Sequence, residues 1–468
     1  MFFAQYYLDC LSQASYMIAD EETGNAVVVD PRRDVAEYLA DAESRGLTVV
    51  GVINTHFHAD FVAGHLELAA RTGAWIGYGR RAVTEYPVRA LADGERIVLG
   101  EVTLEILETP GHTPESVSVL VREHADDAVP YGVLTGDALF IGDVGRPDLL
   151  ASSGVSAEEL GSMLYDSVRN KLMTLPDEVR VFPAHGAGSA CGKNLSTERW
   201  STIGAQRATN YACAPMSRSA FVELVTAGQS AAPEYFSYDA DLNRRRRELH
   251  DPGAAPRPLG VEEFAARRAA GAVVLDARTP QDFAAGHLRG AVNVPADGRF
   301  AEQVGTVLAP TDELLVVAPQ NREREIFTRL ARVGFDRFAG YLRDPDDHLA
   351  AFGDDEVTPA SRVTATDLRA ALDGERPPLV IDVRGCAERG AAGYLDAAVH
   401  IPLGELPGRL GEIADDRPVV VHCAGGHRSS IAASLLRHRG LADVSDLLGG
   451  YAAWAMAEER LGVPDAPA

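Results

Sequence analysis

The second half of the chain contains one pattern twice, roughly 100 residues apart, and this repeat constrains the fold more than any other feature. The first copy opens with V-V-L-D-A-R at 273–278, and the second opens with L-V-I-D-V-R at 379–384. Each copy continues through a G-x-L-x-x-A-V segment to a further apolar run, at 314–317 and at 419–421. Apolar strands that alternate with helical stretches predict a mainly parallel sheet. The repeat therefore predicts two copies of one α/β domain.

The region before the repeat has a different organisation. A length of 468 residues is enough for about three domains. Short apolar runs alternate with polar or helical stretches up to residue 250, as at 26–30 and 49–53. Four consecutive arginines at 244–247 precede D-P-G-A-A-P-R-P, which predicts a linker over 241–256, and we interpret the arginines as a solvated helix end. We expect three domains, at 1–250, 257–356 and 360–468.

Charge and cysteine usage narrow the class of protein. The formal net charge of -24 argues against nucleic acid and anionic membranes as partners, because both would repel the chain. Five scattered cysteines do not form a disulfide framework, so a reducing compartment fits. The N-terminus lacks the pattern of a signal peptide, and no apolar run approaches the ~20 residues of a membrane helix. We expect a cytoplasmic protein, and we predict a homo-oligomer.

Histidines and carboxylates follow several apolar strands of the first region. The run T-H-F-H-A-D-F-V-A-G-H begins at Thr55, directly after the apolar run 49–53. Three further loops follow turns or apolar runs and supply His112, Asp137 and His185. Side chains at the ends of neighbouring strands can converge on one metal ion. Together these loops predict a metal site rather than isolated structural histidines.

The H-x-H-x-D element and the loops around His112, Asp137 and His185 resemble the metallo-β-lactamase superfamily over about the first 240 residues. The resemblance implies an αββα sandwich. The common superfamily motif continues with a histidine that helps to hold a second metal, but this chain has Phe61 there. A phenyl ring cannot ligate a metal, which favours a single-metal site.

The segments D-A-L-F-I-G-D-V-G-R-P-D-L-L and H-G-A-G-S-A-C-G-K-N-L resemble the persulfide dioxygenases, which are the mononuclear iron branch of that superfamily. This resemblance implies one Fe(II) per chain, held by His56, His112 and Asp137. Two histidines and one carboxylate leave positions open for O2 and a substrate thiolate, as in other non-heme iron(II) oxygenases. Zinc is redox-silent, so the implied reaction requires iron.

Further residues of the first region are expected around the metal. We expect His58, Asp60 and His185 to orient ligands or bound water by hydrogen bonds. Cys191 lies in a Gly-rich loop, where it either approaches the iron and relays sulfur or is a buried inert thiol. Lys193 and Arg199 are candidates for binding substrate carboxylates.

A second reactive motif, H-C-A-G-G-H-R-S-S, follows the apolar run 419–421. A cysteine between a strand and a helix N-terminus has its thiolate stabilised by the helix dipole and by loop N–H groups. The segment resembles the active loop of the rhodanese family over residues 360–468, which implies that Cys423 carries sulfur and that Arg428 holds the loop or an anionic donor. The loop is shorter than the C-x5-R loop of cysteine phosphatases, which favours sulfur transfer. We expect the flanking His422 and His427 to be exposed and neutral.

The matching loop of the first copy is A-P-Q-N-R-E-R. Aligning Arg324 with Arg428 places Pro319 at the position of Cys423. Proline has no nucleophile, so we predict that the first copy is catalytically inert and serves as a spacer, dimer contact or docking surface.

These features predict oxidation of a small thiol persulfide by O2 to sulfite and free thiol, coupled to sulfur transfer at Cys423 that gives thiosulfate. The sequence leaves open which thiol carries the persulfide and in which direction sulfur moves between the two sites. One alternative is a thioester hydrolase resembling hydroxyacylglutathione hydrolase, which would use metal-bound hydroxide. Another is a non-enzymatic scaffold whose rhodanese-like modules bind partners.

Overall fold

The computed structural model describes residues 1–149, 154–193, 195–229, 231–251, 253, 256–353 and 355–462. The chain divides into two compact units. The first unit contains Met1–Gly253 and Ala331–Gly334, and the second contains Ala254–Leu330 and Phe335–Ala468. The three domain boundaries expected from the sequence are a finer division, and they stay a prediction.

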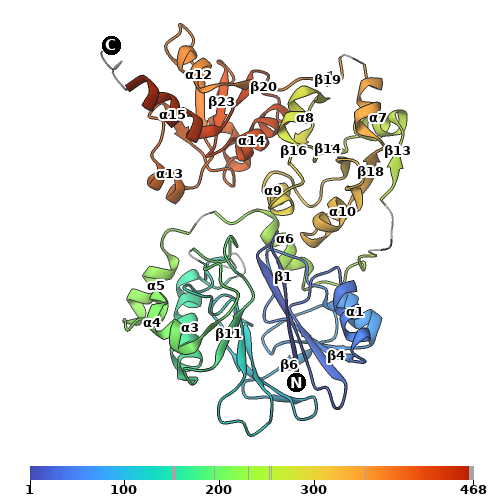
Figure 1. Cartoon of the computed structure of the whole chain (residues 1–468), viewed down its shortest axis with the longest axis vertical. Helices are drawn as coiled ribbons and strands as arrows, with labels where there is room; N and C mark the ends of the chain where they lie inside the picture. Colours follow the sequence, from blue (N-terminus) through green and yellow to red (C-terminus); the bar gives the residue numbers. More distant parts are fainter. Residues whose placement is uncertain are drawn as a thin grey trace, which may run out of the picture. The chain divides into compact units, whose positions relative to one another are not determined.

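Two six-stranded sheets form the first unit (Figure 1). The first sheet has the order β1 (Phe2–Leu8), β2 (Gln13–Ala19), β3 (Asn25–Val29), β4 (Thr48–Ile53), β5 (Trp75–Gly79) and β6 (Arg89–Leu91). The second has the order β12 (Ser201–Thr202), β11 (Arg180–Pro183), β10 (Gly132–Gly136), β9 (Val117–Arg122), β8 (Thr103–Glu108) and β7 (Arg96–Val98). Strands β3 to β6 pair in parallel, and so do β10 and β11.

Strand β2 explains how the layers are held together, because all seven of its residues are buried. Successive side chains of a strand point to opposite faces. Tyr16 and Ile18 accordingly pack into the core between the two sheets, where they meet residues such as Leu104 and Phe182 of the second sheet. Met17 and Ala19 pack on the other face in a separate core, which also contains residues of α1 and α2. The sheet is therefore covered on both faces.

Helices cover the outer faces of both sheets, which confirms the αββα sandwich. The first sheet is covered by α1 (Ala36–Ser44) and α2 (His65–Thr72). Figure 1 shows α3 (Ala157–Asn170), α4 (Ile203–Thr209) and α5 (Arg218–Thr226) gathered beside the sheet that contains β11. Their apolar residues, with those of η2 (Leu172–Thr174) and η3 (Tyr211–Cys213), form a core with the second sheet. Helix α3 starts with a capping box between Ser156 and Glu159.

The second unit contains two five-stranded sheets with the same strand order. The first is β13 (Pro258–Leu259), β18 (Phe338–Leu342), β17 (Leu314–Val317), β14 (Val273–Asp276) and β16 (Val292–Asn293). The second is β20 (Ser361–Val363), β24 (Val444–Leu447), β23 (Val419–His422), β21 (Leu379–Asp382) and β22 (Ala398–His400). All strand pairs in both sheets are parallel. The repeat and its parallel sheets are therefore confirmed.

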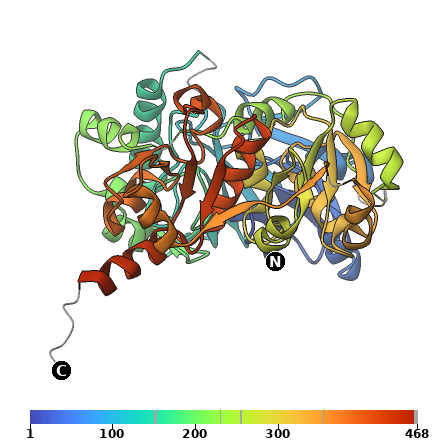
Figure 2. The same cartoon turned by 90° about the horizontal axis from the view of Figure 1, so that it is seen from above.

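Helices connect the strands in both copies. The first copy contains α7 (Val261–Ala269), α8 (Pro280–Ala285), α9 (Phe300–Val307), α10 (Glu323–Arg332), α11 (Pro345–His348) and η4 (Leu349–Ala351). A short antiparallel pair, β15 (His287–Leu288) with β19 (Val357–Thr358), lies beside its sheet. The second copy contains α12 (Ala365–Leu372), α13 (Cys386–Ala392), η5 (Pro407–Glu412), α14 (His427–His438) and α15 (Gly450–Gly462). Helix α15 is the red helix that leads to the C-terminal end in Figure 2.

The predicted linker is only partly a linker. Its first residues, Asp241 and Leu242, end helix α6 (Tyr235–Leu242), while Pro252, Ala254 and Ala255 lie outside the described residues. The interpretation of the arginine run as solvated is wrong for Arg247, whose side chain is only 4% exposed and pairs with the buried Glu67 of α2. This ion pair connects the segment after α6 to helix α2. In the part of the chain that the structure describes, no helix combines the length and apolar character needed to cross a bilayer.

Candidate metal centre and sulfur-transfer loop

Three predicted metal ligands meet at the ends of strands from both sheets. His56 follows β4 of the first sheet, whereas His112 and Asp137 follow β8 and β10 of the second. The Asp137 Oδ2 atom lies 3.4 Å from His112 Nε2 and 3.8 Å from His56 Nε2. All three side chains are buried. Their ligand atoms lie within 4.8 Å of one another, which is close enough to bind one ion together.

Hydrogen bonds fix which nitrogen of each histidine faces the others. His112 Nδ1 lies 2.9 Å from the carbonyl oxygen of Arg146, which can only accept, so Nδ1 carries the proton. His56 Nδ1 lies 2.9 Å from the hydroxyl of Thr55, which already donates to Asp30, so this Nδ1 also donates. In both rings the lone pair is therefore on Nε2, the atom that faces Asp137.

The buried atoms at the centre fit a metal ion. His56 Nε2 and Asp137 Oδ2 have no hydrogen-bond partner among the described residues. Buried polar atoms are rarely left without a partner, because desolvation then costs about 1–3 kcal/mol each. A cation bound to these atoms would remove that cost. Two imidazoles and one carboxylate are a donor set that suits a first-row transition metal such as iron.

Asp30 organises this loop, and sequence reasoning missed it. Its carboxylate accepts from the Thr55 amide at 2.7 Å and from the Thr55 hydroxyl at 2.9 Å, and it lies 2.9 Å from His58 Nε2. The buried carboxylate of Asp30 thus holds both Thr55, which precedes His56, and His58. The signal in the sequence was an acidic residue at the end of an apolar strand, V-V-V-D at 27–30.

His185 lies between two carboxylates. Its Nδ1 is 2.8 Å from Asp137 Oδ1, and its Nε2 is 2.8 Å from Asp60 Oδ2. Burial would lower the pKa of His185, but Asp137 and Asp60 raise it well above its usual range. Burial would likewise raise the pKa of Asp137, but His185 and His56 hold it well below its usual range. His185 therefore leaves Asp137 ionised, with Oδ2 directed at the two Nε2 atoms.

Cys191 is close to this group. Its sulfur and the ligand atoms of Asp60 and His185 lie within 4.8 Å of one another, and all three side chains are buried. Burial, with the carboxylates of Asp60 and Asp137, raises the pKa of Cys191 well above its usual range. The thiol is therefore protonated at neutral pH, and it is a weak nucleophile unless a cation binds beside it.

Phe61 and Gly145 lie close to these side chains. The Phe61 ring lies 4.3 Å from the ring of His58 and 6.4 Å from that of His185, between centroids. A side chain on Gly145 would place its first carbon 2.1 Å from the Asp137 carbonyl oxygen and 3.0 Å from His112 Nδ1. Only glycine lets the loop that holds His112 pass this close.

The two cationic side chains predicted to bind substrate have other partners. Lys193 Nζ donates to the carbonyl oxygens of Leu224 and Ala227, at the end of α5. Arg199 stacks on the ring of Tyr7 and lies 3.3 Å from Asp9. Neither contact brings these side chains to His56, His112 and Asp137. Their role in substrate binding stays a prediction.

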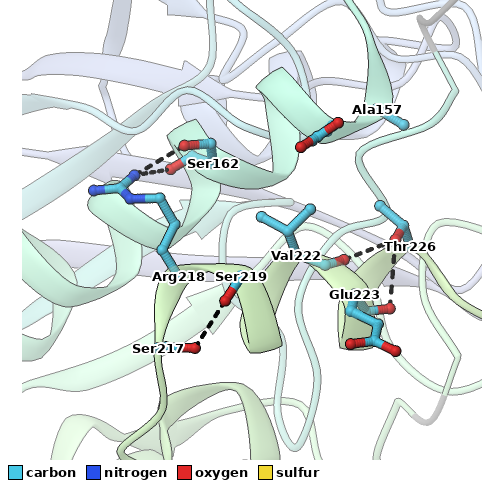
Figure 3. Close-up of a pocket in the computed structure, with 9 residues that line it drawn as sticks. Ala157, Ser162, Ser217, Arg218, Ser219, Val222, Glu223 and Thr226 are labelled. Carbon is cyan, nitrogen blue, oxygen red and sulfur yellow. Dashed lines mark hydrogen bonds between the residues drawn. The ribbon is translucent and has the colours of Figure 1, made fainter.

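A separate surface pocket of about 850 Å³ lies between α3 and α5 (Figure 3). In it, Arg218 donates to the carbonyl and hydroxyl oxygens of Ser162. Among the described residues, those that line it are Ala157, Glu158, Ser162, Ser217, Arg218, Ser219, Val222, Glu223 and Thr226, and none of them is a predicted site residue.

Cys423 directly follows β23 and precedes α14 in the second unit. The amide of Gly426 donates to Cys423 Sγ at 3.2 Å, and Ser429 Oγ lies 3.6 Å from the same sulfur. Gly426 has φ +100°, a backbone conformation that L side chains rarely adopt. This glycine turns its amide toward the sulfur, as the predicted loop requires.

Charged groups surround the loop. Arg428, in the first turn of α14, pairs with Glu388 of α13 at 2.6 Å.

The expectation that the histidines flanking Cys423 are both exposed is wrong for His422, because the sheet buries it on β23. His427 is exposed. Burial lowers the pKa of His422, which is therefore neutral at pH 7.

The strand register corrects the alignment of the two copies. Asp276 of β14 is paired with Val317 of β17, and Asp382 of β21 is paired with His422 of β23. Ala318, not Pro319, therefore occupies the position of Cys423. The alignment by arginines failed because the first loop is one residue longer before its helix. The first copy still has no thiol at this position.

The first copy contacts the helix that follows Cys423. Asn293 of β16 receives a hydrogen bond from Ser430 Oγ, and its amide donates to Ser434 Oγ at 2.9 Å. His438 Nδ1 lies 2.7 Å from the carbonyl oxygen of Gly290. Gln303 Oε1 of α9 lies 3.0 Å from His427 Nε2. Helix α14 is thus held by both copies.

Comparison with known proteins agrees with this architecture. The metallo-beta-lactamase superfamily model matches residues 8–185, and the rhodanese-like domain model matches residues 260–344 and 364–457. The chain belongs to the metallo-β-lactamase superfamily and carries two rhodanese-like domains.

Its similarity to named relatives is more specific. The mitochondrial persulfide dioxygenase ETHE1 of Bos taurus is 31% identical over 40% of this chain and 68% of its own length. A hydroxyacylglutathione hydrolase of Polaromonas is 34% identical over 36% of this chain and 61% of its own length. The crystal structure of a metallo-beta-lactamase from Staphylococcus aureus superimposes with a TM-score of 0.66 and 32% identity, over 73% of this chain and 98% of the other.

Proposed function

We propose that the protein is an iron-dependent persulfide dioxygenase with an attached sulfurtransferase. In the first reaction, a low-molecular-weight persulfide such as glutathione persulfide reacts with O2 and water to give the free thiol, sulfite and two protons. In the second, a persulfide on Cys423 transfers its outer sulfur to sulfite, giving thiosulfate and the Cys423 thiolate. The similarity to persulfide dioxygenases and the rhodanese-like domains support both activities.

The convergence of His56, His112 and Asp137 carries the proposal. We assign these residues as ligands of one Fe(II) per chain, because their facing atoms are buried, poor in partners and of the right chemical type. Bound ferrous iron supplies the redox chemistry that O2 needs in order to react with a thiolate sulfur, which zinc does not.

The protein's own residues prepare the ligands. Thr55 and the carbonyl of Arg146 keep the protons of both histidines on Nδ1, so that Nε2 is available. His185 holds Asp137 Oδ1 and leaves Oδ2 for the metal. His58 and Asp60 are proposed to keep this arrangement fixed, through Asp30 and His185. We propose that Cys191 lies beside the bound substrate, given its place next to Asp60 and His185.

Cys423 is proposed to accept sulfur from a second persulfide molecule, which releases a free thiol. The Gly426 amide stabilises the sulfur anion, and Arg428 attracts the anionic sulfite. All five cysteines are free, which supports a reducing compartment, and we propose the cytoplasm.

The test is product analysis with glutathione persulfide under air. The proposal predicts that one O2 disappears for each persulfide oxidised, and that thiosulfate forms at the expense of sulfite. Hydrolysis of S-lactoylglutathione without O2 uptake would contradict it and favour the thioester hydrolase, which is the activity named for the Polaromonas relative.

A further inference from the structure

Arg428 is the arginine of the sulfur-transfer loop, and a carboxylate already occupies it. Its guanidinium lies 2.6 Å from Glu388 Oε1, and the two side chains are 32% and 35% exposed. Burial lowers the pKa of Arg428, but Glu388 and the nearby Cys423 thiol raise it overall. The hydrogen bond from Arg428 also lowers the pKa of Glu388, so both groups are charged at neutral pH. A negative charge therefore lies beside the loop that handles sulfite and thiosulfate.

Two other arginines close to this loop are held elsewhere. Arg384 is fully buried, pairs with Asp382 at 2.7 Å and stacks against Tyr451. Arg389 lies 3.7 Å from Asp382 Oδ2 and stacks against the ring of Tyr394. A thiosulfate dianion at Cys423 would therefore need Arg428, and to use it the anion would have to compete with Glu388.

We propose that Glu388 is a specificity-determining residue of this loop, which occupies Arg428 and weakens the binding of thiosulfate. The inference rests on the sulfur transfer proposed for Cys423. In that step the S–S bond of the Cys423 persulfide breaks, the outer sulfur bonds to the sulfur of sulfite, and the electron pair of the broken bond stays on Cys423 Sγ. Thiosulfate leaves more readily when Glu388 takes Arg428 back, so the carboxylate favours release of the product.

The second copy contains a matched ion pair that serves as a control. Arg409 pairs with Glu405 at 2.8 Å, where both side chains are 33% exposed, and it also pairs with Glu412 at 2.7 Å. The pair of Arg409 with Glu405 has nearly the same length and exposure as the pair of Arg428 with Glu388. Removal of the Glu405 charge therefore reports the general effect of losing a surface carboxylate.

The experiment is a calorimetric titration of full-length Cys423→Ser protein with thiosulfate, with and without Glu388→Gln. Serine keeps an acceptor for the Gly426 amide and prevents turnover. Glu388→Gln is expected to lower the Kd for thiosulfate by about three- to fivefold, the range for a partly exposed ion pair. Glu405→Gln in the same background should leave the Kd unchanged. An unchanged or higher Kd with Glu388→Gln would overturn the proposal, because it would mean that Glu388 only positions Arg428.

Turnover provides a second readout. The assay uses thiosulfate and cyanide as substrates and protein that retains Cys423. Glu388→Gln should lower the KM for thiosulfate by the same factor, without raising kcat. If the wild-type protein transfers no sulfur, the proposed sulfur transfer is overturned. A Kd shift caused by Glu388→Gln in the Cys423→Ser background would then still support the effect of Glu388 on thiosulfate binding. A KM that rises together with a falling kcat would contradict that role.

Discussion

The two rhodanese-like copies share one framework and differ where the chemistry would occur. Both have five parallel strands in the same order, and in both a buried aspartate follows the first apolar run and pairs with an arginine two residues later. At the decisive position the first copy has Ala318 and the second has Cys423. In the first copy, Arg322 of the loop pairs with Asp297 and Glu325. The framework therefore tolerates loss of the thiol, because the core and the sheet do not depend on the loop.

The comparison also shows how the first copy contacts the second. Asn293 and Gln303 of the first copy contact α14 of the second. Helix α14 begins at the residue after Gly426, whose amide points at Cys423. A domain without a thiol at this position thus contacts the helix that follows Cys423 in its neighbour.

The largest expected effect comes from exchanging the residues at the decisive position. Cys423→Ser should abolish thiosulfate formation and leave O2 uptake intact, so that sulfite accumulates. Addition of Ala318→Cys to that variant should not restore thiosulfate, since the first loop is one residue longer. Ion chromatography of sulfite and thiosulfate, with an oxygen electrode, measures both. If Ala318→Cys restored thiosulfate formation, the two loops would not differ in the way that we propose.

A smaller effect should come from the backbone of the active loop. Gly426→Ala forces a non-glycine residue to φ +100° and disturbs the amide that donates to Cys423. We expect sulfur transfer to fall roughly tenfold, the usual loss for one hydrogen bond to a charged group. The control is Asn321→Gly in the first copy, where φ is +66°, and its turnover should not change. Equal loss in both variants would mean that the loops are coupled.

The smallest effect should come from the contact between the copies. Gln303→Ala removes a single exposed hydrogen bond to His427, so sulfur transfer should fall about twofold. Gln281→Ala on the exposed face of α8 is the control. Steady-state rates of thiocyanate formation measure both variants. A loss of a hundredfold for Gln303→Ala would show that the first copy takes part in the chemistry.

Much of this architecture could be predicted from the sequence, because local patterns determine it. The apolar run 314–317 is strand β17, and the repeat specified both parallel sheets. A metal site was predicted from the histidines and carboxylates that follow several strands, and the resemblance to persulfide dioxygenases implied which three residues would be its ligands. The predicted trio does come together, although its role as a metal site stays a proposal.

The remaining features depend on contacts between distant residues. Asp30 binds Thr55, and Glu388 binds Arg428 across 40 residues. The charge run that ends in Arg247 looked solvated, because its partner Glu67 lies 180 residues earlier. Ala318 could be placed only from the pairing of strands, since a one-residue insertion is invisible in an ungapped alignment. Such contacts carry no short-range signal.

The central claim is that His56, His112 and Asp137 hold one redox-active iron. The most direct measurement is the metal content of anaerobically purified protein, combined with O2 uptake on addition of glutathione persulfide, for the wild type and His112→Ala. The account predicts about one iron per chain and O2 uptake in the wild type. It predicts that His112→Ala loses the iron and at least about a hundredfold of the O2 uptake, while thiosulfate:cyanide transfer at Cys423 persists. Two zinc ions per chain with no O2 uptake would contradict it.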